Sequence, residues 1–267
     1  MSIAEKLTAI AQNQQAVYDA GYAAGQVASG DAEAVYQQGV TDGIEQGKQA
    51  EYDRFWDAFQ ENGNKKTYRY AFAGGGWSEE TLIPKYPINI IDTSTTTRYG
   101  QGMFYYLGAG LPDTNLFDMT EICKRVDFSK AINLQYLCFN AKAKNITVDA
   151  SGAQNLSQAF QGGDGGFIDN ITLTVSSACN NYNNTFIHSS GLKNLTFTSG
   201  SEIAASISLQ QSSKLTRASI ESVVTALSDN TSGLTATFNK TAKEAAFTTD
   251  EWNALVATKP NWTITLA

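Results

Sequence analysis

Short runs of alternating apolar and polar residues recur in the middle of the chain. The words NITV, NITL and NLTF begin at Asn145, Asn170 and Asn194, with spacings of 25 and 24 residues. Apolar side chains at every second position are typical of a strand that buries one face. So short a strand cannot bury that face alone, and copies of it must stack on one another. The pattern therefore predicts a repeat whose units are strands, with a period of about 22 to 26 residues.

A second word, V-D-x-S-x-A-x-N-L, occurs at Val126 and again at Val148, an offset of 22 residues. A degraded third copy begins at Thr174. The aspartates of the first two copies, Asp127 and Asp149, stand two residues before a serine, as turn-forming aspartates do. The asparagines of both words are expected to stack in columns, where their amides would bond turn backbone and satisfy otherwise unpaired carbonyls.

The apolar positions of the two words are expected to form the core of the repeat. They are Val126, Leu134, Leu137, Phe139, Ile146, Val148, Leu156, Phe160, Ile171, Leu173, Phe186, Leu192, Leu195 and Phe197.

The segment before the repeat has a different pattern. Residues 3–59 contain no proline and are rich in Ala, Gln, Glu and Tyr, which predicts helix. The apolar residues Ile3, Leu7, Ile10 and Val17 follow the spacing of a short coiled coil. Glycines spaced four apart would lie on one helical stripe and let subunits approach closely. This expected oligomer seam consists of Gly21, Gly25, Gly39, Gly43 and Gly47. The alternative is a frayed surface helix or a linker around residues 28–33.

The segment after the repeat predicts a mixed terminal unit. An amphipathic helix is expected from Leu215, and a second helix is expected where Thr248 and Glu251 have the spacing of a capping box. Alternation predicts strands at Leu234 and Trp262. A repeat of strands needs such an atypical unit to cover its last open edge.

Composition and charge exclude several classes of function. A net charge of −7 without a clustered basic face argues against nucleic acid as a partner. The first residues lack the apolar segment of a signal peptide, and no apolar run approaches the length of a membrane span, so neither export by that route nor membrane insertion is expected. The three cysteines are expected to be buried thiols, because they have no C-x-x-C spacing. With one histidine in the chain, no catalytic triad, metal site or cofactor is expected.

Two resemblances add to this interpretation. The stretches NLQYLCFNAKAKNITV, NLSQAFQGGDGGFIDNITL and NYNNTFIHSSGLKNLTF resemble BspA-like leucine-rich repeats over about residues 120–210. The words QAEYDRFWDAFQENG and YRYAFAGGGW, preceded by Y-x-x-G-x-x-x-G repeats, are similar to structural proteins of tailed bacteriophages and prophages of gut bacteria. The second resemblance implies a virion protein made in the cytoplasm of a bacterial host. It also favours a homotrimer, because phage fibres are usually threefold symmetric.

The expected fold class is therefore α+β, with a long N-terminal helical or coiled-coil stem, a short leucine-rich-repeat-like β-solenoid and an α/β C-terminal cap. Four domains are expected: a stem at 1–62, an aromatic and glycine-rich junction at 63–119, the solenoid at 120–213 and the cap at 214–267.

Two functions from different classes are compatible with these features. The first is a non-enzymatic tail fibre or tail-associated protein, which is anchored to other virion proteins by its stem and displays the repeat to a glycan or protein of the host surface. The alternative is a tailspike-like enzyme that degrades glycans, for which Asp127 and Asp149 would be the carboxylate pair. Ligand contacts are expected at residues that the repeat does not require, although Tyr182 could instead replace a core leucine. The candidates are Tyr105, Tyr106, Asp164, Tyr182 and His188.

Overall fold

A computed structural model of the chain describes most residues after the first 31. The described ranges are 32–63, 68–74, 82–109, 111–112, 114–163 and 167–267. The chain forms two compact units, 1–61 and 62–267. The predicted coiled coil at Ile3 to Val17 and the seam glycines Gly21 and Gly25 lie outside the described residues.

Helix α2 (Ala32–Gly63) is the described part of the predicted stem. Its polar and apolar residues are mixed around the helix, and Ile44 is half exposed. An added Cβ atom at Gly39 or Gly47 would meet nothing within 4 Å, so this side of α2 is open in the described part of the structure. No heptad stripe is therefore visible along α2, and the predicted coiled coil has no counterpart there.

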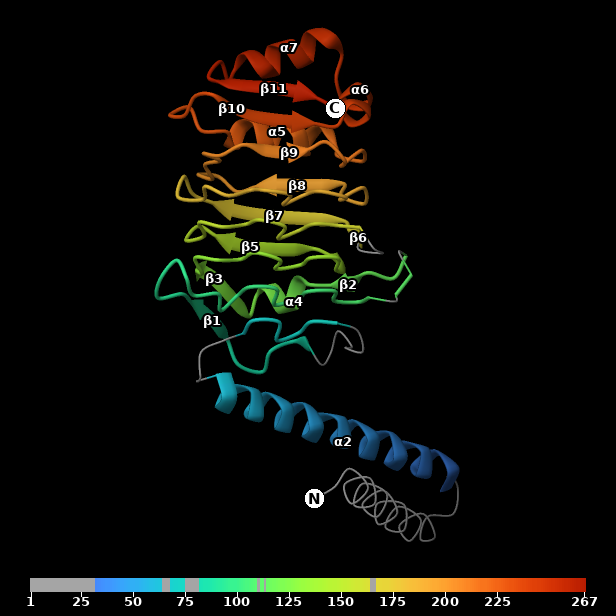
Figure 1. Cartoon of the computed structure of the whole chain (residues 1–267). Coiled ribbons are helices and arrows are strands. Elements are labelled where there is room, and N and C mark those ends of the chain that lie inside the picture. The colour runs from blue at the N-terminus through green and yellow to red at the C-terminus, as the bar shows by residue number, and fades with distance from the viewer. Residues whose placement is uncertain (1–31, 64–67, 75–81, 110, 113, 164–166) are drawn as a thin grey trace. The chain divides into compact units, whose positions relative to one another are not determined.

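In the second unit, short parallel strands stack one above another (Figure 1). Their bounds are β1 (Ile88–Ile91), β2 (Phe117–Asp118), β3 (Val126–Lys130), β4 (Lys142–Lys144), β5 (Ile146–Ala150), β6 (Phe167–Ile168), β7 (Asn170–Val175) and β8 (Asn194–Phe197), with a short helix α4 (Thr120–Cys123) between β2 and β3. They form the sheets β1-β3, β2-β4-β6 and β5-β7-β8. Ile146 pairs with Ile171, which pairs with Leu195, so the three repeated words lie in register.

A stack of β-turns forms another side of this unit. It consists of five layers, at residues 68–74, 100–107, 134–141, 156–162 and 182–189, which together are called the turn ribbon. Within a layer, alternate N–H groups close turns, as Leu137 N–H does by donating to the Leu134 carbonyl at 3.2 Å. The N–H groups between them donate to the following layer, as Tyr136 N–H does to the Ser157 carbonyl at 3.2 Å. Each layer is thus held to its neighbour by backbone hydrogen bonds without being a strand.

The fold class predicted from the sequence is therefore wrong. The strands of the described residues form four separate parallel sheets of two or three strands each, and not the continuous sheet of a leucine-rich-repeat-like β-solenoid behind a coiled-coil stem. The physical reason is the backbone of the turn ribbon. Residues four apart in a layer, such as Tyr136 (φ 62°) and Asn140 (φ 52°), adopt left-handed conformations. These conformations turn the chain where a strand would have to run straight.

The predicted core positions are buried, with one exception. In the turn ribbon, Phe72 stacks on Phe104 with ring centroids 5.8 Å apart, and Phe160 stacks on Phe186 at 5.9 Å. The exception is Phe139, which is half exposed. Its side chain points out of the turn ribbon, so the prediction for this residue is wrong.

Asparagine columns run through the stack as predicted, but their partners differ. Asn170 Nδ2 donates to Asn145 Oδ1 at 3.1 Å, and Asn194 Nδ2 donates to Asn170 Oδ1 at 2.7 Å. In a second column, Asn155 Oδ1 accepts from Ser157 N–H at 2.9 Å. The amides thus bond one another and backbone N–H groups, rather than the carbonyls that the sequence suggested.

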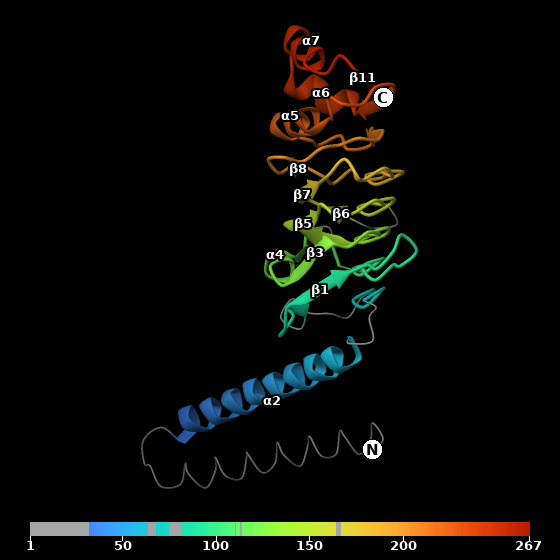
Figure 2. The same ribbon diagram turned by 90° about the vertical axis from the view of Figure 1, so that its left-hand side faces the viewer.

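The C-terminal part closes the stack with helices and three further parallel strands. It contains β9 (Ile207–Leu209), α5 (Arg217–Ala226), β10 (Leu234–Phe238), α6 (Lys240–Ala246), α7 (Thr249–Ala257) and β11 (Trp262–Leu266). Strands β9, β10 and β11 form one parallel sheet, and the three helices lie at this end of the unit (Figure 2). The capping box of Thr248 and Glu251 is present at the start of α7, as the sequence predicts.

Helix α5 satisfies the last edge of the sheet β5-β7-β8. The hydroxyl groups of Ser219 and Ser222 accept from the N–H groups of Leu195 and Phe197 at 2.9 and 2.8 Å. Two serine side chains thus take the place that the carbonyls of another strand would fill, and the sheet ends without an open edge on this side.

We expect Phe160→Ala to lower the free energy of unfolding by about 3–5 kcal/mol, because the ring is fully buried and the remaining cavity cannot collapse. Urea unfolding followed by tryptophan fluorescence measures the change. Ile187→Ala, at a half-buried position in the next layer, is the control and should cost clearly less. A loss below about 1 kcal/mol for Phe160→Ala would contradict this packing.

Candidate functional site

Five aromatic side chains gather on the outer face of the turn ribbon. They come from its first three layers and are called the aromatic surface: Tyr70, Tyr105, Tyr106, Tyr136 and Phe139. Tyr70 is 38% exposed and the other four are half buried. Large aromatic rings that remain accessible in a cluster are typical of binding surfaces.

Tyr105 lies at the centre of this surface. Its ring stacks on Phe139 with centroids 4.9 Å apart and an interplanar angle of 6°. The edges of Tyr70 and Tyr136 meet Tyr105 at 5.4 and 6.2 Å, and Tyr106 lies 4.8 Å away. These contacts fix the rings in place before any ligand arrives, which lowers the entropic cost of binding.

Three of the tyrosines have left-handed backbone conformations. Their φ angles are 55° at Tyr70, 57° at Tyr106 and 62° at Tyr136. Such a conformation costs an ordinary residue roughly 1–2 kcal/mol, and bulky residues rarely adopt it. Residues in strained conformations cluster at functional sites, so the strain here suggests that these rings have a role beyond folding.

The turn ribbon itself shows which residues would fit without this cost. The hydrogen bonds between layers place five residues at equivalent positions: Tyr70, Gly102, Tyr136, Gln158 and Asn184. Glycine and asparagine tolerate left-handed conformations best, and the chain uses them at two of these five positions, with tyrosine or glutamine at the other three. Glycine is needed at position 102 for a second reason, because a Cβ atom there would lie 2.2 Å from the ring of Tyr70.

Polar groups border the aromatic surface. The Arg69 guanidinium lies 5.1 Å from the ring centroid of Tyr70. With its amide oriented to satisfy both ends, Asn140 accepts from the Tyr106 hydroxyl at 2.9 Å and donates to the carbonyls of Gly162 and Gly163 at 2.7 and 3.0 Å. Asn140 thus links Tyr106 to Gly162 and Gly163, where the fourth layer ends.

The structure brings together only part of the predicted site. Tyr105 and Tyr106 lie in the aromatic surface, whereas Asp164 lies outside the described residues. Tyr182 is only 3% exposed, and burial raises the pKa of its hydroxyl, so its prediction as a contact is wrong and it replaces a core leucine instead. His188 is exposed in the fifth layer, and its N–H donates to Gln211 Oε1 at 2.5 Å.

Sequence reasoning missed Tyr70, Tyr136 and Phe139. Equivalent positions in successive layers, such as 70, 102, 136, 158 and 184, are 32, 34, 22 and 26 residues apart. No constant period therefore connects the aromatic residues in the sequence. The spacing of Tyr70 and Gly74, or of Tyr136 and Asn140, is the available signal, because left-handed turn residues recur four apart in four of the five layers.

The aspartates considered for glycan hydrolysis form turns. Asp127 Oδ1 accepts from Ser129 N–H at 2.8 Å, and Asp149 Oδ1 accepts from Ser151 N–H at 3.0 Å. The hydrogen bonds from Ser129 lower the pKa of the Asp127 carboxyl. A general acid in glycoside hydrolysis needs the opposite, a raised pKa.

The cysteine thiols have environments that suppress their reactivity. Burial raises the pKa of Cys123 to about 11 and that of Cys138 well above its ordinary value. A thiol with such a pKa is protonated at neutral pH and is a poor nucleophile.

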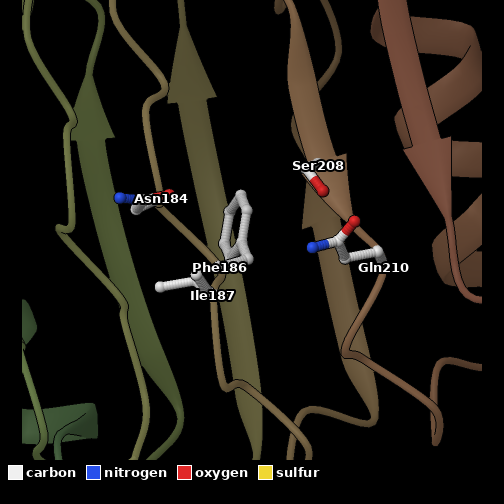
Figure 3. Close-up of a pocket in the computed structure, with 5 residues that line it drawn as sticks. All are labelled: Asn184, Phe186, Ile187, Ser208 and Gln210. Atoms are coloured by element: carbon white, nitrogen blue, oxygen red, sulfur yellow. The ribbon is translucent and has the colours of Figure 1, made fainter. Parts of the chain in front are cut away.

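A small cavity lies where the turn ribbon meets the strand β9 (Figure 3). It has a volume of about 30 Å³ and is lined by Asn184, Phe186, Ile187, Ser208 and Gln210. The layer on one side is made of turns and the layer on the other is strand β9, so their backbone hydrogen-bonding groups do not match. The Gln211 side chain accepts the His188 N–H in place of a backbone carbonyl. Such a volume holds about two water molecules, which is too little for a ligand.

Comparisons of the chain with protein-family models, curated proteins and solved structures found no match. Among the described helices, none has an apolar segment of the length needed to cross a membrane. The described residues also contain no group of three or more His, Cys, Asp or Glu side chains that could hold a metal ion. No family is therefore assigned to the chain.

We expect Tyr136→Asn to change the free energy of unfolding by no more than about 1 kcal/mol, because relief of backbone strain offsets the lost ring contacts. Asn184 occupies the equivalent position two layers away, so asparagine fits this turn. Urea unfolding measures the effect.

Tyr99→Asn is the matched control, because Tyr99 is also half buried but has no left-handed backbone to relieve. We expect this control to be more destabilising than Tyr136→Asn. The reverse order would show that Tyr136 is retained for stability and not for binding.

Proposed function

We propose that this protein is a non-enzymatic bacteriophage virion protein that attaches to host-surface glycans through the aromatic surface. The observation that carries the proposal is the cluster of five accessible rings, three of which stand on strained, left-handed backbone. Gly102 and Asn184 show that glycine or asparagine fits an equivalent position with less strain, and the ring contacts of tyrosine only offset its strain. Contact with a ligand gives a reason to keep tyrosine there.

The chemistry of the aromatic surface suits sugars. Tyrosine presents a flat apolar face, which packs against the C–H groups of a sugar ring, and a hydroxyl group, which bonds the sugar hydroxyls. Further polar groups follow in the next layer, where Gln158 Nε2 donates to Gln161 Oε1 at 2.8 Å. The rigid rings limit the entropy lost on binding.

The assignment to a virion is supported by the resemblance of the stem and junction words to phage structural proteins. We propose that the first unit joins three copies into a homotrimer and binds other virion proteins, and that Gly39, Gly43 and Gly47 of α2 form part of the seam. Three weak glycan sites on one particle gain avidity, because the second and third contacts are intramolecular. A single shallow surface would then suffice for attachment.

The aromatic surface is tested by the double variant Tyr105→Ala/Tyr106→Ala. We expect its binding to cells of the host bacterium to fall by at least about tenfold, since buried aromatic contacts at binding sites are worth more than 1 kcal/mol each. Flow cytometry with the labelled protein measures binding. Tyr86→Ala, which removes a half-buried tyrosine elsewhere, is the control and should bind normally.

Two outcomes would contradict the proposal. Unchanged binding by the folded double variant would mean that the protein is a structural spacer or that another surface makes the contact. Release of shortened glycans from host envelopes by the wild-type protein would instead show a glycan-degrading enzyme.

The homotrimer is tested by light scattering on the full chain and on residues 62–267, which form a unit of their own. We expect three times the monomer mass for the full chain and the monomer mass for the shorter chain, because the proposed seam lies in the first unit. A monomeric full chain at micromolar concentration would contradict the trimer.

A further inference from the structure

A polar groove lies where the chain enters the last three turn layers, at the residues directly before each of them. It has a volume of about 240 Å³. Its lining, called the amide groove, consists of Thr95, Ile132, Asn133, Gln154, Asn155, Asn180 and Asn181. Five of these seven residues carry a side-chain amide, so the groove presents one kind of chemistry over three successive layers.

Backbone pairing arranges these residues in two adjacent rows. In one row, Gln154 N–H donates to the Ile132 carbonyl at 2.9 Å, and Asn180 N–H donates to the Gln154 carbonyl at 3.2 Å. In the other row, parallel bridges join Asn133 to Asn155 and Asn155 to Asn181. The groove is therefore a fixed grid, in which amides repeat at the spacing of stacked layers, about 4.8 Å.

The two rows use their amides differently. Asn133, Asn155 and Asn181 accept backbone N–H groups two residues ahead through Oδ1, at 3.0, 2.9 and 3.0 Å, so these side chains have structural roles. Gln154 and Asn180 have no side-chain hydrogen bond within the described part of the chain, although they lie in adjacent layers of one row. Two amides are thus available to a ligand.

The charge around the groove restricts what can bind there. No lining residue is ionisable. The nearest carboxylate bonded to the grid is that of Asp92, which accepts the N–H groups of Ile132 and Asn133 through Oδ2 at 2.6 and 2.9 Å. A buried negative charge under one end of the groove disfavours anionic ligands. A neutral ligand rich in hydroxyl groups fits both the charge and the amides.

We propose that the amide groove is a second binding site, which takes a segment of a neutral glycan through the side chains of Gln154 and Asn180. An amide offers both a donor and an acceptor, as a sugar hydroxyl does, so one row of amides bonds a run of hydroxyls without matching a unique sequence of partners. A ligand with a repeating structure suits a row with a repeating structure. The site is separate from the aromatic surface and does not depend on it.

Solution NMR of the full chain tests the groove directly. The probes are chito-oligosaccharides and malto-oligosaccharides, both neutral, titrated to millimolar concentration. We expect the side-chain NH₂ signals of Gln154 and Asn180 to shift on addition of at least one of them. A tri-galacturonate of similar length, which carries carboxylates, should shift them at least about tenfold more weakly.

Variants separate a specific site from general contact. Gln154→Ala/Asn180→Ala should weaken binding of the active oligosaccharide by roughly tenfold, because two hydrogen bonds are lost. Asn253→Ala removes an exposed amide from α7 and should leave binding unchanged. Both positions of the double variant are on the surface or half buried, and circular dichroism checks that it folds.

The outcomes also distinguish this site from the aromatic surface. Tyr105→Ala/Tyr106→Ala should retain the shifts at Gln154 and Asn180, even where it abolishes attachment to cells. If neither class of neutral oligosaccharide shifts these signals, or if tri-galacturonate shifts them equally well, the inference is wrong, and the proposal for the aromatic surface is unaffected.

Discussion

Hydrogen bonds between the backbones of successive layers are the interaction on which the second unit depends. In the sheets, in-register parallel pairing joins β5, β7 and β8. In the turn ribbon, every second N–H group joins its layer to the next, as Gln158 N–H does by donating to the Asn183 carbonyl at 2.9 Å. Once the layers are joined in this way, equivalent side chains must lie above one another, and buried phenylalanines and asparagine columns follow from that alignment.

The same interaction sets a requirement at both ends of a stack, because a layer without a neighbour leaves its backbone groups unpaired. Side chains meet this requirement at the described ends. The Asp92 carboxylate accepts from Ile132, Asn133 and Tyr99 at one end of the amide rows, and the hydroxyls of Ser219 and Ser222 accept from β8. The Gln211 side chain does so for His188, where turns give way to strand β9. Caps of this kind define where repetition stops.

Stacking also explains why the proposed binding surface is on the outside of the turns. Inward positions are committed to the core, as the full burial of Phe160 and Phe186 shows. Outward positions are free to vary, and the first three layers use them for tyrosines at an energetic cost. The proposed attachment function accounts for that cost. The amides of Gln158 and Gln161 in the next layer add polar groups beside the aromatic surface.

The sequence by itself determined the repeated words, the core positions and the terminal helices. Alternation and helix capping are local signals, and the alternation recurs in every copy of the repeat. It also singled out Tyr105 and Tyr106 as residues that the repeat does not require, and the structure places both in the aromatic surface. Only the tertiary structure decided that turns replace strands on one side, that Phe139 points outward and that Tyr182 points inward. These outcomes depend on left-handed backbone conformations and on backbone hydrogen bonds between layers whose lengths in the sequence differ. Tyr70, Tyr105 and Tyr136 meet because backbone hydrogen bonds align their layers, and no local pattern in the sequence records that alignment.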